Sequence, residues 1–289
     1  MSASVTLAGV PVEEPHAKDM RFAALIWGPA GSGKTILAST APGDKLLLCF
    51  DPDGDVSLAD RSDVKVMRLY TANPLTVAGE FRKSDPYTLT RYLTERPELA
   101  TVVFDSMTTY ADMALRVAVQ ANQTGRNTIS VEQPSIAGWS YRNQMVKQCA
   151  NNMLALTAKL GRNIIFTTHE GSPQLDDKGA IESITMILST NLANEIGLRI
   201  NEIWHLRDND GRSRVISVRP HLKMKPMKTR MFNATTPQFT WHFDANTMVG
   251  EGIADWWLAW KNNGGQKLAL PTVAQSTTSK GGQKKAPTR

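Results

Sequence analysis

The sequence predicts an α/β fold, with a mostly parallel central sheet flanked by helices and a β-rich extension toward the C-terminal end. Two observations predict it. Short continuous apolar runs recur along the chain, as in parallel strands that are buried on both faces. Between these runs lie segments whose apolar residues repeat with a helical period, which is the alternation of strand–helix–strand units.

The expected elements follow one another in that alternation. Continuous apolar runs predict strands at residues 22–27, 46–50, 64–70, 101–104 and 164–168. Helical spacing predicts helices at residues 34–40, 86–95, 107–120 and 135–161. Weaker signals place strands at residues 201–205, 214–218 and 240–243, a hairpin turn at residues 208–211 and a helix at residues 253–260.

Composition and charge divide the chain into parts. Of its 289 residues 41% are hydrophobic, which is enough for a buried core. We expect a flexible N-terminal arm over residues 1–20, one main domain over residues 21–260 and a disordered basic tail over residues 261–289. The tail has basic residues and no acidic ones, so it accounts for the net charge of +6. Residues 212–230 are likewise basic without an acid, and each stretch is either a solvated surface or a contact for phosphates.

The cysteines and the hydropathy of the chain indicate the cellular compartment in which the protein is expected. Cys49 and Cys149 form neither a metal-ligand nor a redox spacing, which suits a reducing cytoplasm. No apolar run approaches the length of a membrane span, and the N-terminal residues do not read as a signal peptide. We therefore expect a cytoplasmic protein that has no membrane partner.

The string GPAGSGKT lies between the first expected strand and the first expected helix. It matches the phosphate-binding loop pattern G-x-x-x-x-G-K-[ST], and the flanking strand and helix argue against an accidental glycine-rich turn. Glycines let backbone amides approach phosphate oxygens, Lys34 reaches the terminal phosphates and Thr35 offers a hydroxyl to Mg²⁺. The sequence therefore predicts that ATP and Mg²⁺ bind at Gly28, Pro29, Ala30, Gly31, Ser32, Gly33, Lys34 and Thr35.

A second element is TVVFDS at residues 101–106, an apolar strand that ends at Asp105. Ligands of open α/β sheets bind at the carboxyl ends of the strands, so Asp105 is expected beside the loop. Taken alone, an apolar run that ends in Asp is most often structural. Together with the loop it predicts a Walker B carboxylate that holds Mg²⁺ with Thr35, directly or through water.

Hydrolysis also needs a carboxylate that activates water, and the candidates lie in FDPDGD at residues 50–55. Asp51, Asp53 and Asp55 compete for this role. An EF-hand is excluded because the twelfth positions counted from Asp51 and Asp53 are Ser62 and Val64, which cannot supply a bidentate carboxylate. We favour Asp53, and an acidic turn without a catalytic role is the alternative.

The order of these motifs resembles that of RecA-like ATPases. The likeness is closest to phage-encoded RecA-like nucleotide-binding proteins, some of which are single-strand annealing proteins. It covers roughly residues 20–232 and rests on GPAGSGKT, on FTTHE at residues 166–170 and on NEIWHL at residues 201–206. Only the first of these motifs is highly specific.

The resemblance implies a slow ATPase that binds single-stranded DNA and assembles into a ring or a filament, in the host cytoplasm if it is phage-encoded. A single-strand-binding protein is an implied partner. Asp53 would stand in place of the catalytic Glu of RecA-like proteins, and the shorter side chain argues for slow hydrolysis. His169, at the end of its strand, would sense the terminal phosphate and relay its presence to a DNA-binding loop. A buried, hydrogen-bonded histidine is the alternative for His169.

The basic residues also gain roles from the resemblance. Lys223 and Lys225 would line a single-strand path, whereas Lys228 and Arg230 would reach the γ-phosphate of a neighbouring subunit. A solvated surface remains open for all four. Two other functions compete with the recombination protein: an ATPase that acts on protein partners, and a small-molecule kinase, for which we find no compact arginine-rich lid.

Overall fold

The computed structural model describes residues 6–271, apart from residues 8–9, 12–13, 122–130, 132–133, 189, 211–212, 245–246 and 248. Most of the expected basic tail, residues 272–289, and part of the expected turn at 208–211 therefore lie outside the described residues. The N-terminal arm is described only in part.

The elements alternate as the sequence predicts, with additions. The strands are β1 (Thr6–Leu7), β2 (Val10–Pro11), β3 (Ala23–Gly28), β4 (Asp44–Cys49), β5 (Val64–Arg68), β6 (Leu99–Asp105), β7 (Asn163–His169), β8 (Gln174–Leu175), β9 (Ile181–Ser183), β10 (Glu202–Asp208), β11 (Arg214–Ser217), β12 (Phe232–Asn233), β13 (Gln238–Trp241) and β14 (Leu268–Ala269). The α-helices are α1 (Lys34–Ser39), α2 (Pro74–Arg82), α3 (Tyr87–Thr94), α4 (Met107–Ala121), α5 (Ile136–Lys159), α6 (Thr190–Arg199) and α7 (Ile253–Asn262). Short 3₁₀-helices are η1 (Ala17–Asp19), η2 (Val56–Leu58) and η3 (Leu69–Thr71).

The central sheet has 8 strands in the order β13-β11-β10-β3-β7-β6-β4-β5. From β10 to β5 the neighbours pair in parallel, and β11 and β13 extend the β10 side with antiparallel pairs. The predicted fold class is therefore confirmed. Because parallel strands share one direction, the carboxyl ends of β3, β4, β6 and β7 meet at one edge of the sheet, here called the carboxyl edge.

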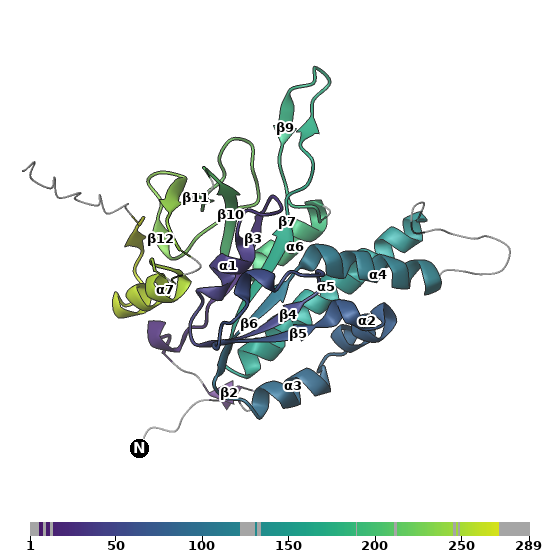
Figure 1. Cartoon of the computed structure of the whole chain (residues 1–289), viewed down its shortest axis with the longest axis horizontal. Coiled ribbons are helices and arrows are strands. Elements are labelled where there is room, and N and C mark those ends of the chain that lie inside the picture. Colours follow the sequence, from purple (N-terminus) through teal and green to yellow (C-terminus); the bar gives the residue numbers. More distant parts are fainter. Residues whose placement is uncertain are drawn as a thin grey trace, which may run out of the picture.

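Helices cover both faces of this sheet. In β3, Leu25 and Trp27 pack into the cluster that includes α2, α4, α5 and α6, whereas Ala24 and Ile26 pack into the cluster that includes α1 and α7. Figure 1 shows α1 and α7 on one side of the sheet and α2, α4 and α5 on the other. Alternate residues of β3 thus face opposite sides, as strand geometry requires.

Two parts of the fold differ from the sequence-based expectation. Helix α2 lies between the expected strand at residues 64–70 and the expected helix at residues 86–95, where no helix was predicted. Its start is fixed by Asn73, whose side chain accepts a hydrogen bond from the amide of Leu75 at 2.9 Å. At the other end of the chain, α7 continues to Asn262 and β14 pairs with β12. Regular structure therefore extends past the domain boundary expected at residue 260.

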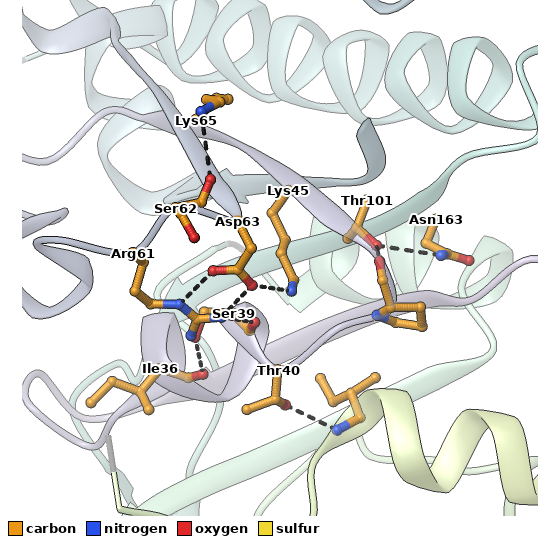
Figure 2. Close-up of polar contacts among 12 residues, drawn as sticks. Ile36, Ser39, Thr40, Lys45, Arg61, Ser62, Asp63, Lys65, Thr101 and Asn163 are labelled. Carbon is orange, nitrogen blue, oxygen red and sulfur yellow. Dashed lines mark hydrogen bonds and ion pairs between the residues drawn. The ribbon is translucent and has the colours of Figure 1, made fainter. Parts of the chain in front are cut away.

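The C-terminal end of α1 is anchored by Arg61. The guanidinium group donates to the side-chain oxygen of Ser39 at 2.6 Å and to its carbonyl oxygen at 3.2 Å (Figure 2). Asp63 holds Arg61 at 2.6 Å and Lys45 at 2.7 Å. The hydrogen bond from Arg61, together with Lys45, lowers the pKa of Asp63. This group ties α1 to the starts of β4 and β5.

The same end of α1 also holds α7. The side-chain oxygen of Thr40 accepts a hydrogen bond from the amide of Ile253 at 2.9 Å, and the carbonyl of Thr40 accepts one from Ala254 at 2.9 Å. Gly252 lies so close that a Cβ atom there would be 2.4 Å from the Cβ of Thr40. Helix α7 can therefore approach α1 only with glycine at this position. None of the helices in the described part of the chain combines the length and the apolar character that crossing a membrane requires.

Candidate active site

The loop between β3 and α1 has the geometry that its sequence predicts. Gly31 and Gly33 have φ angles of 74° and 90°, which side chains disfavour. A Cβ atom at Gly28 would lie 1.9 Å from the carbonyl oxygen of Leu206 in β10, and one at Gly33 would lie 2.3 Å from Nε of Arg214. Glycine is thus required at Gly28 by a backbone neighbour and at Gly33 by the backbone shape.

Lys34 opens α1 and is buried, with 6% of its surface exposed. Its Nζ donates to the carbonyl oxygens of Gly28 at 3.0 Å and Pro29 at 2.7 Å. Burial lowers the pKa of Lys34 to about 8, although Asp105 and Asp51 act in the opposite direction. The ammonium group is therefore held at the loop and is only weakly compensated by acids.

Thr35 and Asp105 meet at the start of α1. The Thr35 hydroxyl donates to Oδ2 of Asp105 at 2.6 Å, and the hydroxyl of Thr167 in β7 donates to Oδ1. Burial raises the pKa of Asp105, while these two hydrogen bonds oppose the rise. The pair offers two oxygen ligands side by side, as the sequence predicts for a metal.

Magnesium fits these two residues. Among the residues that the structure describes, no group of three or more His, Cys, Asp or Glu side chains could hold a metal. Mg²⁺ does not need such a group, because it keeps several water ligands and is commonly bound by one or two protein oxygens together with phosphates. Thr35 and Asp105 are therefore suited to Mg²⁺ bound with a nucleotide.

The acidic turn after β4 brings Asp51, and not Asp53, to the loop. Asp51 lines the same cavity as Lys34, and the hydroxyl of Thr109 donates to its Oδ1. Asp53 is exposed, has a left-handed backbone with φ of 58° and does not line the cavity. Asp55 pairs with Arg68 at 2.6 Å. Asp51 thus has the position that we expected for Asp53.

His169 ends β7 and joins Lys34 to Asp51. Its Nδ1 lies 3.4 Å from Nζ of Lys34, and its Nε2 lies 4.0 Å from Oδ2 of Asp51. The backbone amide donates to the hydroxyl of Thr108 at 2.9 Å. Burial, and then the charge of Lys34, lower the pKa of His169. A neutral ring accepts from Lys34 at Nδ1 and carries its hydrogen on Nε2, toward Asp51.

Arg214 is a site residue to which the sequence-based interpretation gave no specific role. It begins β11, and its Nε donates to the carbonyl of Ser32 at 3.1 Å. The guanidinium group lies over the ring of Trp241, 5.8 Å from the centroid. Strand β11 runs antiparallel to β10, so its first residue lies at the carboxyl edge of the sheet. The expected start of this strand was therefore the sequence signal that could have identified Arg214 as a site residue.

These residues surround one cavity of about 320 Å³ at the carboxyl edge. Its lining residues come from the loop, from the carboxyl ends of β4, β6 and β7, and from β11: Gly31, Gly33, Lys34, Thr35, Ile36, Asp51, Gly54, Ser57, Asp105, His169 and Arg214. A cavity that gathers a phosphate-binding loop, a metal-binding pair and a carboxylate can bind a nucleotide and direct water at its phosphates.

Lys228 and Arg230 do not line this cavity. The backbone of Lys228 pairs with Ile203 near the start of β10, and the amide of Arg230 donates to Glu202 at 2.7 Å. The starts of β10 and β3 lie at the opposite edge of the sheet, here called the amino edge, so Arg230 is separated from Gly28 by the length of β3. The side chain of Arg230 is exposed.

Lys223 and Lys225 lie beside the β8–β9 hairpin instead. The amide of Ile184 donates to the carbonyl of Lys223 at 3.1 Å, and the amide of Lys225 donates to Ile184 at 3.1 Å. Nζ of Lys223 also bonds to the carbonyl of Ile181. Both lysines are exposed.

The loosely matching segments FTTHE and NEIWHL meet in space. Nε2 of His205 lies 2.6 Å from a carboxylate oxygen of Glu170, directly after His169. His205 is buried against Trp27, and burial lowers its pKa. The amide of Glu170 donates to the carbonyl of Gly28 at 2.9 Å. Glu170 therefore connects the phosphate-binding loop to β10.

Comparison with known families agrees with this site. Residues 20–230 match the AAA domain family, a match that includes the loop, Asp51, Asp105 and His169. No match to a curated protein was found. The family supports nucleotide binding and ATPase activity at the loop. The chain belongs to the AAA domain family.

Proposed function

We propose that this chain is a RecA-like ATPase of phage type that binds single-stranded DNA and uses ATP to control its hold on that DNA during recombination or annealing. The observation that carries the ATPase part is that four residues of the phosphate-binding loop meet three polar residues from strand ends in one cavity: Gly31, Gly33, Lys34 and Thr35 with Asp51, Asp105 and His169. The proposal of DNA binding rests on the resemblance to RecA-like proteins and on the exposed Lys223 and Lys225 beside the β8–β9 hairpin.

Binding of ATP follows from the loop. Its amides bind phosphate oxygens, and Lys34 exchanges its contacts with the carbonyls of Gly28 and Pro29 for contacts with the terminal phosphates. Arg214, fixed to the loop through Ser32, adds a second positive charge at the cavity. Thr35 and Asp105 would hold Mg²⁺, which would neutralise phosphate charge.

Asp51 accepts the proton of the attacking water. Its Oδ1 is fixed by Thr109, while Oδ2 faces His169 at 4.0 Å. Neutral His169 contacts both Lys34 and Asp51, so it senses the terminal phosphate that both groups approach. The side chain of Asp is shorter than that of Glu, and we expect hydrolysis to be slow.

The choice between Asp51 and Asp53 has a direct test. Asp51→Asn should lower the rate of ATP hydrolysis by roughly 100-fold or more, while ATP binding remains. The matched control is Asp53→Asn, which should hydrolyse ATP at close to the rate of the unaltered chain. The opposite pattern would return the role to Asp53.

The route to DNA leaves the site directly after His169. The chain continues through Glu170 into the β8–β9 hairpin, which projects beyond the end of β7 in Figure 1. On its return, the amide of Ile187 donates to the carbonyl of His169 at 2.9 Å. Ile184 in the same return segment pairs with Lys223 and Lys225. A displacement of His169 by the terminal phosphate would thus reach two exposed lysines through one short segment.

Assembly accounts for the other two basic residues. Lys228 and Arg230 lie toward the amino edge, away from the cavity of their own chain. We therefore propose that they act on the γ-phosphate of a neighbouring subunit in a ring or a filament. Burial and the charge of Arg230 lower the pKa of Lys228. A single-strand-binding protein is the further partner in this proposal.

Fluorescence anisotropy of a labelled single-stranded oligonucleotide tests the DNA part, with and without ATP and Mg²⁺ and over a range of salt concentrations. We expect binding that ATP strengthens, that Lys34→Ala uncouples from ATP and that salt weakens. The double variant Lys223→Ala/Lys225→Ala should bind more weakly and reduce the salt dependence, because each lost phosphate contact lowers its slope by about 1. The control is Lys65→Ala, an exposed lysine on β5.

Failure of the oligonucleotide to bind at low salt, with ATP still bound, would overturn the DNA part and leave the ATPase part intact. It would favour an ATPase that acts on protein partners. Transfer of phosphate to a small molecule would instead identify a kinase.

A further inference from the structure

A second and larger cavity lies at the amino edge of the sheet. Its volume is about 670 Å³, and it opens between the segment before β3, the start of β10 and helix α7. Six of its lining residues carry the argument: Arg21, Glu202, Arg230, Trp257, Trp260 and Lys267. None of its lining residues lines the nucleotide cavity.

Three cations line this cavity without carboxylate partners. The side chains of Arg230 and Lys267 are exposed and form no ion pair with any described residue. Arg21 donates to two neutral acceptors, the hydroxyl of Thr157 and the carbonyl of Leu154, both at 3.1 Å. Burial lowers the pKa of Arg21, with no acid acting against it.

The buried acid of the cavity does not compensate these cations. Glu202 accepts from the amides of Arg230 at 2.7 Å and Met231 at 3.0 Å through Oε1. Its Oε2 accepts from the indole of Trp204 at 2.9 Å and the hydroxyl of Thr229 at 2.6 Å. Both oxygens are therefore committed to donors of the protein. The other acidic lining residue, Asp19, is exposed and forms no ion pair with the described cations of the lining.

An apolar wall faces these charges. The rings of Trp257 and Trp260 stack with centroids 4.7 Å apart and an angle of 10° between their planes. Trp260 is 7% exposed, and its buried Nε1 has no hydrogen-bond partner among the described residues. The stacked indoles therefore give the cavity an apolar wall.

We propose that the amino-edge cavity of the unassembled chain binds a small organic anion with a planar apolar body, at a site separate from the nucleotide site of that chain. The anionic group lies among Arg21, Arg230 and Lys267, and the apolar body contacts the indoles. The volume is within the range of small-molecule sites.

The test uses 1-anilinonaphthalene-8-sulfonate, an aromatic sulfonate whose fluorescence rises on transfer to an apolar site, with calorimetry for the stoichiometry. We expect one saturable site on the full chain, equally present in Lys34→Ala. The double variant Arg230→Glu/Lys267→Glu should weaken binding by about tenfold or more, since two attractive charges become repulsive. Trp260→Phe, which keeps an aromatic ring but makes the apolar wall smaller, should weaken it several-fold.

Arg219→Glu is the matched control, because Arg219 is an exposed cation of the same basic segment that does not line the cavity. Its affinity for the sulfonate should be unchanged. N-phenyl-1-naphthylamine, which lacks the sulfonate, should bind more weakly and should not distinguish the double variant from the unaltered chain. Equal binding of the sulfonate by the double variant, loss of the site in Lys34→Ala, or no saturable binding would each overturn the proposal.

Discussion

The two ends of helix α1 lie one short helix apart and are built in opposite ways. At the N-terminal end, Lys34 is buried with a lowered pKa, and its donors are satisfied only by carbonyls of the loop and a neutral histidine. At the C-terminal end, Arg61 has a carboxylate partner and makes four hydrogen bonds, to Ser39 and Asp63. Charge is thus left available where phosphates bind and is neutralised where the helix is anchored. Substitutions at the N-terminal end should therefore change ATP affinity, whereas substitutions at the C-terminal end should change the stability of the fold.

The largest effect is expected for Lys34→Ala. ATP affinity should fall by about 100-fold or more, since a charge-assisted contact with the terminal phosphates is lost. The melting temperature without nucleotide should not fall, because removal of a buried ammonium group relieves a desolvation cost. Calorimetry with ATP and thermal unfolding measure both quantities, and Lys65→Ala is the control for each. A large fall in melting temperature would mean that Lys34 also anchors the fold.

Arg61→Ala should lower stability and leave ATP affinity nearly unchanged. The variant loses hydrogen bonds to both Ser39 and Asp63, so the free energy of unfolding should fall by about 2–4 kcal/mol. ATP affinity should stay within about threefold of the unaltered chain. Urea unfolding and calorimetry give the two values.

The control for Arg61→Ala is Arg91→Ala, which breaks an exposed pair with Glu95 on α3. Its free energy of unfolding should stay close to that of the unaltered chain, because an exposed ion pair contributes little to stability. Equal losses for Arg61→Ala and Arg91→Ala would contradict an anchoring role for Arg61.

Gly252→Ala tests the contact between α1 and α7. The added methyl group would meet Thr40 at 2.4 Å, and we expect a loss of about 1–3 kcal/mol in the free energy of unfolding. Gly79→Ala in α2 is the matched control, because a Cβ atom there meets nothing within 4 Å. That substitution should stabilise the chain by about 0.5–1 kcal/mol, as helix propensity predicts. Chemical denaturation of both variants checks the opposite signs.

The smallest effect concerns pH. The pKa of Lys34 is lowered to about 8 in the chain without nucleotide. ATP binding favours the protonated ammonium, so affinity should be constant below that pKa and fall as pH rises above it, by at most about tenfold per pH unit. Lys34→Ala, although weak, should show no such dependence. A flat profile from pH 7 to pH 10 for the unaltered chain would show that Lys34 keeps an ordinary pKa.

Sequence reasoning could place residues at the cavity where the motif is contiguous or ends a buried strand. The loop is one uninterrupted string, and Asp105 and His169 reach the cavity because they end buried parallel strands whose apolar runs are readable. The fold class followed from the same runs.

The sequence could not choose among Asp51, Asp53 and Asp55, because a turn has no period that assigns its side chains to a face. The left-handed backbone at Asp53, and the hydroxyl of Thr109 that holds Asp51, come from the tertiary structure. Arg214 could have been recognised from the expected hairpin turn, because an antiparallel pair with β10 brings the start of β11 to the carboxyl edge. Helix α2 could have been recognised from Asn73 and Pro74, a capping residue followed by proline.

The position of β3 in the sheet has a consequence for how the chain folds during synthesis. Phe22, just before β3, donates to the side chain of Asn163 at the start of β7, which is 141 residues later in the sequence. The other neighbour, β10, comes later still. At roughly 5–20 residues per second, the wholly buried strand that carries the phosphate-binding loop leaves the ribosome on the order of ten seconds before either neighbour exists. During that interval only the elements translated between β3 and β7, such as α1, α2 and α4, are available within the chain to cover this apolar segment.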